Sequence, residues 1–173
     1  AMKGFKPGQV RGMPNKTFGG LHASQLGAFK GAALKAIKPG QWNAMPPGAM
    51  GGFGAGQFRS LPDDVLDGFK PANMGAMPPA VFGGMKPKQI DALGNNAFSR
   101  IGPAQSAEFT PKALKTMNSQ QFKFMPKEAF AGFDAKQIKS LSPAIMGTFK
   151  ADKLGALTNA AFAGFTPKQI DVI

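Results

Sequence analysis

Cysteine is absent from this chain of 173 residues, histidine occurs once, and long hydrophobic runs are missing. The lack of cysteine excludes disulfides, thiolate metal sites and a cysteine nucleophile. No apolar stretch approaches the roughly 20 residues that a membrane-spanning helix needs, and no signal peptide opens the chain. We therefore expect a soluble segment without a transmembrane helix.

The residue types that carry catalysis are also scarce. The lone histidine, His22, stands at a turn position of the repeat described below, where a solvated side chain is the expected role. The one carboxylate cluster is Asp63, Asp64 and Asp67, which is typical of dipole and N-cap stabilisation in a first helical turn, with weak cation binding as the alternative. The glycine-rich stretch 51–56 lacks the Gly-Lys-Ser/Thr ending of a phosphate-binding loop. The sequence predicts no enzyme, no cofactor, no metal site and no small-molecule substrate.

Acidic residues are absent from the first 62 positions, which hold eight of the 21 basic residues of the chain. The whole chain has nine acidic residues and a formal net charge of +12. Such an excess serves solubility in many proteins and polyanion binding in others. The first third of the chain is its more cationic part.

What the chain does contain is a strict repeat of eight residues, which we call an octad. Apolar residues recur at alternating steps of five and three from Phe5 to Ile173, and we call these positions rungs. Of the 43 rungs only Ser106 is not apolar, and 16 of the 17 aromatic residues are rungs. A register this strict indicates stacked copies of one small unit. We therefore expect the rungs, Trp42 included, to form a continuous apolar core.

The residues after the first rung of an octad indicate that each octad begins a short helix. All 15 prolines stand at the two positions after this rung. In the octad that starts at Phe165, Thr166 suits an N-cap, Pro167 the first helical position, and Gln169 a capping-box partner. A β-solenoid is the main alternative, but prolines at ten octads would each remove a ladder donor. A polyproline helix, with its three-residue period, does not fit eight. The predicted fold class is all-α, a solenoid of very short helical turns.

A second pattern doubles the period to 16 residues. Every other octad carries glutamine at its fifth position, with Asn73 and Lys153 as the two exceptions, and we call these the Gln-bearing octads. The glutamines are Gln9, Gln25, Gln41, Gln57, Gln89, Gln105, Gln121, Gln137 and Gln169. The intervening octads carry Thr, Ala, Val or Ile at this position. We predict a 16-residue coil of two 8-residue half-coils, and about ten coils in an elongated rod on the order of 80 to 100 Å long.

The glutamine column has two structural explanations. A glutamine at the third helical position can return a hydrogen bond to the N-cap backbone, or it can form a ladder with its counterpart one coil along. Contact with a ligand is the alternative. We expect the structural role.

The domain organisation follows from the repeat. Residues 5–173 are interpreted as a single tandem-repeat solenoid of about 21 octads. The opening Ala-Met suggests that residues 1–4 are a cloning remnant and lead-in, and the cut after a first rung suggests a fragment of a longer repeat region. Without capping repeats, exposed rungs would favour end-to-end self-association or continuation into more repeats.

Some octads resemble a known kind of repeat. The octads that start at Phe165 and at Leu141-Ser142-Pro143 are similar to the short Leu-Thr-Pro-x-Gln-apolar repeats of large bacterial secreted and cell-surface proteins. The resemblance covers nearly the whole chain and implies a structural repeat segment that is secreted or lies at the bacterial cell surface. This chain departs from the pattern because it is rich in Gly, Met and Lys, and because Lys or Pro often replaces Ser or Thr before the helix. The resemblance transfers no functional residue.

Two main classes of function follow. The uninterrupted register and the scarcity of catalytic residues favour a structural or scaffold rod, such as a stalk, spacer or filament-forming segment. The alternative is a rod that binds nucleic acid, an anionic polysaccharide or an anionic membrane surface through a lysine-rich side, with affinity that falls as salt rises. The lysines that would make these contacts recur at the second octad position and are Lys6, Lys38, Lys70, Lys86 and Lys150. Protein recognition along one side is a third hypothesis.

Overall fold

The computed structural model describes residues 4–173; of the predicted remnant and lead-in at residues 1–4, residues 1–3 lie outside the described residues. The described chain forms helices and turns and no strand, so the prediction of an all-α protein is confirmed. The helices are α1 (Pro7–Gly12), α2 (Asn15–Gly19), α3 (Ala23–Ala28), α4 (Gly31–Lys35), α5 (Pro39–Ala44), η2 (Pro47–Gly52), α6 (Ala55–Arg59), η3 (Asp63–Val65), α7 (Pro71–Gly75), α8 (Pro79–Gly83), α9 (Pro87–Ala92), α10 (Pro103–Ser106), α11 (Pro111–Leu114), α12 (Ser119–Phe124), η4 (Lys127–Gly132), α13 (Ala135–Ser140), α14 (Pro143–Met146), α15 (Ala151–Leu154), α16 (Asn159–Phe162) and α17 (Pro167–Ile170).

Nearly every octad holds one short helix, and the predicted signals mark where it begins. Each of the ten prolines at octad position 3 is the first residue of its helix, where its missing N–H leaves no hydrogen bond unmade. Thr110 and Ser142 accept hydrogen bonds from backbone N–H groups three residues on, at 3.2 and 3.3 Å. The octad at 93–100 is the exception and forms turns.

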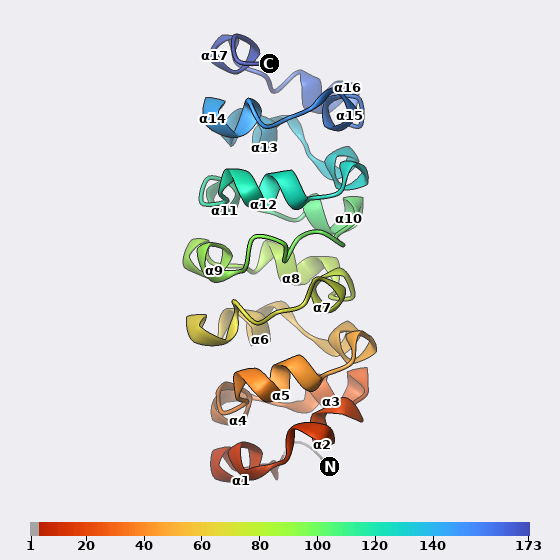
Figure 1. Cartoon of the computed structure of the whole chain (residues 1–173), viewed down its shortest axis with the longest axis vertical. Helices are drawn as coiled ribbons and strands as arrows, with labels where there is room; N and C mark the ends of the chain where they lie inside the picture. Colours follow the sequence, from red (N-terminus) through yellow and green to blue (C-terminus); the bar gives the residue numbers. More distant parts are fainter. Residues whose placement is uncertain (1–3) are drawn as a thin grey trace.

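The helices stack in layers along the longest axis, with the two ends of the chain at opposite ends of the stack (Figure 1). Helices that pack on each other lie three octads apart. α1 starts at Pro7 and packs on α4, which starts three octads later at Gly31. α9, α11 and α13 repeat this offset, from Pro87 to Pro111 and Ala135.

The predicted 16-residue coil is therefore wrong, because a layer contains three octads. Three sides enclose an interior wide enough for the phenylalanine and tryptophan rungs, whereas two opposed helices would leave no room for so many rings. At three octads per layer the chain forms about seven layers rather than ten. At helix-packing distances this gives a length of roughly 55 to 70 Å, shorter than expected.

The layers also wind slowly about the long axis. One side of Figure 1 carries the labels α1, α4, α9, α11, α14 and α17. The first residues of α9 and α11, Pro87 and Pro111, are three octads apart, but those of α11 and α14, Pro111 and Pro143, are four octads apart. A full turn therefore takes slightly more than three octads, and a column of residues spaced three octads apart drifts around the molecule.

The rungs build one continuous hydrophobic core from Val10 to Leu157, as predicted, and buried residues at the fifth position of intervening octads, such as Ala161, add to it. Trp42 is 2% exposed, and its ring centroid lies 5.6 Å from that of Phe53 and 5.2 Å from that of Phe69. Since these rings belong to different octads, the aromatic rungs join neighbouring sides and layers. The indole N–H of Trp42 is buried without a hydrogen-bond partner.

Small residues at the last octad position allow the layers to approach closely. A Cβ on Gly52 would overlap the carbonyl group of Ala23, and one on Gly132 would overlap that of Pro103. Ser106, the one polar rung, is fully buried at the second of these contacts, where its hydroxyl donates hydrogen bonds to the carbonyls of Pro103 and Ala129. The serine is thus a satisfied part of a tight contact between α10 and η4 rather than a defect.

Candidate functional site

The glutamine side chains make the most regular polar contacts in the molecule. Each of the nine glutamines accepts a hydrogen bond at Oε1 from the backbone N–H three residues earlier, at 2.7–3.1 Å. This N–H belongs to the residue before the helix, so Oε1 satisfies one of the donors that a helix start leaves unpaired. The contact is the capping interaction expected of a glutamine at the third helical position.

The other half of the amide reaches the preceding layer. Gln41 donates from Nε2 to the carbonyls of Val10 and Met13 at 2.8 and 2.9 Å. Gln137 donates to those of Ser106, Ala107 and Phe109 at 2.7–3.2 Å. The same bonds, 28 to 31 residues back along the chain, are made by Gln57, Gln89, Gln105, Gln121 and Gln169.

These acceptors are a carbonyl near the end of an earlier helix and one just after it, and the first also accepts from the backbone N–H three residues on, as Val10 does from Met13 at 3.2 Å. One glutamine thus joins the start of its own helix to the end of the helix four octads before it. Gln9 and Gln25 have no earlier layer within the chain, and among their described bonds only the Oε1 contact remains. The glutamines bind backbone groups and not one another.

The two exceptions in the column occupy the same place with different chemistry. The shorter Asn73 is buried and reaches only the carbonyl of Met45, at 3.4 Å. Lys153 is 8% exposed and donates from Nζ to the carbonyls of Phe122 and Lys123 at 2.6 and 2.9 Å. Burial lowers the pKa of Lys153 from its ordinary value of 10.5; Asp152 opposes this shift and Lys150 adds to it.

The five lysines predicted as polyanion contacts do not lie on one side. Lys6 precedes α1, whereas Lys70 precedes α7 and Lys150 precedes α15. In Figure 1, α1 lies at the left, and α7 and α15 lie at the right. The predicted lysine-rich side assumed a two-octad coil, and with three octads per layer the second positions spread around the axis.

Other lysines are brought together instead. The contacting helices α9, α11 and α13 hold Lys88, Lys112 and Lys136 at equivalent positions, three octads apart. We call the lysines of these three octads the lysine row. Its members are all exposed: Lys86, Lys88, Lys112, Lys115, Lys136 and Lys139. The three-octad spacing is visible in the sequence, but nothing in the sequence marks it as the layer length.

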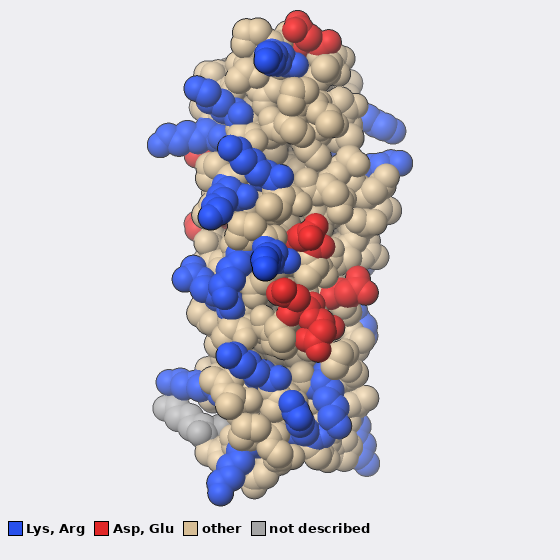
Figure 2. Space-filling view, turned by 90° about the vertical axis from the view of Figure 1, so that its left-hand side faces the viewer, with Lys and Arg blue, Asp and Glu red and all other residues tan. Residues whose placement is uncertain are grey.

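Acidic residues gather at one place on a side of the molecule that is otherwise mostly basic. Figure 2 looks onto the side that carries α1, α4, α9 and α11 in Figure 1, and it shows acidic groups near mid-height with basic groups below, above and beside them. Asp63 and Asp64 begin η3, as expected of acids in a first turn, and Asp91 lies on α9, which packs on η3. The charge on this side is therefore mixed near mid-height and basic elsewhere.

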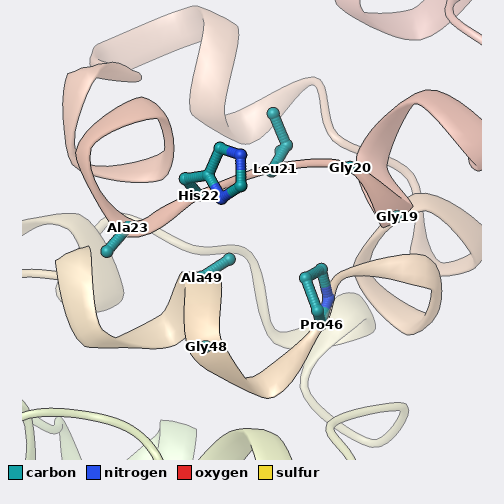
Figure 3. Close-up of a pocket in the computed structure, with 8 residues that line it drawn as sticks. All are labelled: Gly19, Gly20, Leu21, His22, Ala23, Pro46, Gly48 and Ala49. Carbon is teal, nitrogen blue, oxygen red and sulfur yellow. The ribbon is translucent and has the colours of Figure 1, made fainter.

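His22 lies at the rim of an open hollow of about 320 Å³ between α3 and η2 (Figure 3). The hollow is lined by glycine, alanine, proline and Leu21 beside the exposed imidazole. It brings no second titratable side chain near His22, so it provides neither a base with a nucleophile nor a pair of metal ligands. The arrangement matches the solvated turn residue expected from the sequence.

A second hollow, of about 430 Å³, opens at the last layer. Its lining includes Phe162 and Ile170, rungs that are 47% and 60% exposed. Leu154, Phe165 and Ile173 complete the wall. These apolar side chains are the core rungs of a layer on which no further layer packs within residues 4–173.

Neither a metal site nor a membrane-spanning helix is found in the described part of the chain. Residues 4–173 contain no group of three His, Asp or Glu side chains that could hold a metal ion. None of the helices in this part is long and apolar enough to cross a membrane. Comparison with known protein families and with curated protein sequences finds no match.

Proposed function

We propose that this chain is a structural rod, a solenoid segment whose role is to hold other parts of a larger protein apart or to form a filament. The observation that supports it best is the unbroken core of rungs, and glutamine bonds join each layer after the first to an earlier one. The resemblance to repeats of bacterial secreted and cell-surface proteins extends the proposal to a stalk or spacer outside the cell.

The scaffold proposal is tested by the shape of the particle in solution. In small-angle scattering the cross-section should stay constant when two layers, copied from the middle of the chain, are added. The length should grow by roughly 8 to 10 Å per layer, the helix-packing distance. A compact particle whose cross-section increases with added layers would refute the rod.

Self-association end to end is part of the scaffold proposal. The exposed rungs Phe162 and Ile170 would be covered by the first layer of a second copy, as one layer covers the next within the chain. Sedimentation should then show concentration-dependent oligomers that the double substitution Phe162→Ser, Ile170→Ser abolishes. Substitution of the exposed Phe124, which is not a rung, by Ser is the control and should leave the oligomers unchanged.

Polyanion binding is the alternative function, and the lysine row on α9, α11 and α13 favours it. Regularly placed cations on neighbouring helices suit a linear chain of phosphate or sulfate groups. The triple substitution of Lys88, Lys112 and Lys136 by Gln should weaken binding to DNA or heparin at 0.15 M salt and reduce its salt dependence. The same change at Lys6, Lys70 and Lys150, which precede α1, α7 and α15, should have a smaller effect. No binding at this salt would refute the alternative.

A further inference from the structure

A hollow of about 180 Å³ near the N-terminal end gathers basic side chains from three helices. Arg11 comes from the last turn of α1, Lys35 from the last turn of α4, and Lys38 precedes α5. The contact of α1 with α4 brings Arg11 and Lys35 to the same place although they are three octads apart. All three side chains are exposed and line the hollow.

The first two layers, which supply the basic side chains of this hollow, are cationic. Residues 4–62 contain no acidic residue, so no carboxylate from these layers reduces the positive potential. The one carboxylate that lines the hollow is Asp64, from η3. The negative charge of Asp64 opposes anion binding, so its removal should strengthen binding at this site.

The hollow has a charged rim and an apolar wall. Pro39, Pro62 and Val65 are among the residues that line it. The rings of proline and the branched side chain present C–H groups that suit the C–H face of a sugar ring. The hollow is also smaller than the roughly 300–1,000 Å³ of ordinary ligand pockets, so it suits one anionic sugar unit rather than a large ligand.

Nucleic acid fits this surface less well. Within residues 4–173, the large hydrophobic residues that are exposed all lie at position 124 or beyond, so no exposed aromatic side chain of this part is present near the hollow to stack on a base.

We propose that the hollow formed by Arg11, Lys35 and Lys38 binds a sulfated sugar unit of a linear anionic polysaccharide. The sulfate lies between the three cations, and the sugar ring rests on the proline wall. The proposal goes beyond the scaffold role, because a rod could carry this site or function without it.

Binding is measured by titrating the full chain with a heparin-derived tetrasaccharide at 0.15 M salt. The double variant Arg11→Gln, Lys35→Gln should bind roughly tenfold more weakly or worse, because two of the three cations around the sulfate are lost. The control double variant Lys16→Gln, Lys168→Gln loses the same charge at exposed positions outside the hollow and should bind nearly as well as the parent. Asp64→Asn should bind several-fold more tightly.

Equal losses in the two double variants, or no gain for Asp64→Asn, would overturn the site. Inorganic sulfate that competes as well as the tetrasaccharide at equal concentration would overturn the assignment to a sugar. Duplex DNA that binds as tightly, with the same dependence on these variants, would overturn it as well. Scattering of the double variant separates this proposal from the rod, because loss of the site should leave the particle length unchanged.

Discussion

At the scale of single residues, one amide group performs two jobs that proteins commonly divide between two side chains. Oε1 caps the start of a helix, and Nε2 binds carbonyls at the end of an earlier one, as in Gln121 with Ile90 and Leu93 at 2.9 and 3.0 Å. Both jobs require a neutral side chain with one acceptor and one donor end. Glutamate has the right length but supplies only acceptors.

Substitution of Gln137 by Glu should therefore destabilise the protein strongly. The new carboxylate oxygen would face the carbonyls of Ser106, Ala107 and Phe109 in a buried place. We expect a loss of about 3 kcal/mol in the free energy of unfolding, measured by urea denaturation.

Gln9→Glu is the matched control for this prediction. Gln9 is exposed, and its described bond is the one it accepts from the N–H of Lys6, which a carboxylate can also accept. The expected change is within about 0.5 kcal/mol. Similar losses in the two variants would mean that the bonds to the preceding layer do not stabilise the fold.

Lys153 gives a second prediction at this scale, on the dependence of stability on pH. Burial lowers the pKa of this amine below 10.5 in the folded state, so between the two pKa values the unfolded chain binds more protons. The contribution of Lys153 to stability is thus unfavourable at neutral pH and improves as pH rises through that window toward 10.5.

The variant Lys153→Gln should restore the column and should be more stable than the parent at pH 7. Its advantage should shrink as pH rises toward 10.5, because only the parent gains from losing the proton. Urea unfolding of both proteins at several values of pH measures the difference. Parallel curves across that range would contradict the prediction.

At the scale of the helices, the sequence predicted where most helices begin, but it did not predict how the helices pack on one another. Prolines, hydroxyl caps and glutamines act within one octad, so local rules locate nearly every helix. The layer length depends on how many sides enclose the rungs, which no local rule contains. The 16-residue pattern gave the wrong answer because a glutamine such as Gln41 reaches four octads back, and four octads is a multiple of the two-octad alternation.

Glycine at the end of an intervening octad is a packing requirement, and this can be tested within one helix. Gly52 lies in η2 where a Cβ would overlap the backbone of Ala23, whereas a Cβ on Gly51 meets nothing within 4 Å. Gly52→Ala should cost about 1–3 kcal/mol through forced separation of η2 and α3.

Gly51→Ala, the control, should be neutral or stabilising by roughly 0.5 kcal/mol, because alanine restricts the unfolded chain. Thermal unfolding of both variants measures the difference. A neutral Gly52→Ala would show that the layers separate easily, against the close approach described here.

At the scale of the whole molecule, the alternation of octads governs which deletions are tolerated. Deletion of residues 85–100 removes two octads. Each later glutamine then still has a Gln-bearing octad four octads before its own. Deletion of residues 85–92 removes one octad, so that the octads four before those of Gln105 and Gln121 become the intervening octads 61–68 and 77–84, whose fifth positions are the buried Val65 and Val81.

The larger deletion should therefore be the better tolerated of the two. We expect the single-octad deletion to lose about 1–3 kcal/mol for each of the two displaced glutamines, and the two-octad deletion to keep a cooperative transition close to that of the parent. Urea unfolding followed by Trp42 fluorescence measures both. A single-octad deletion as stable as the two-octad one would contradict the role of the alternation.

The surface charge was the least predictable feature of the candidate sites. The excess of positive charge is evident in the sequence, but which lysines share a side depends on the layer length and on the winding. Lys6 and Lys70 looked alike in the repeat but precede helices on different sides, α1 and α7, whereas Arg11 and Lys35 belong to unlike octads of the 16-residue pattern and line one hollow.

The glutamine bonds between layers all point the same way along the chain, from a later residue to an earlier one. During synthesis on the ribosome the acceptors would already be in place when each new glutamine emerges, so every new stretch of chain can dock on the part that has folded before it. The molecule could then fold in the direction of translation, without waiting for its C-terminus.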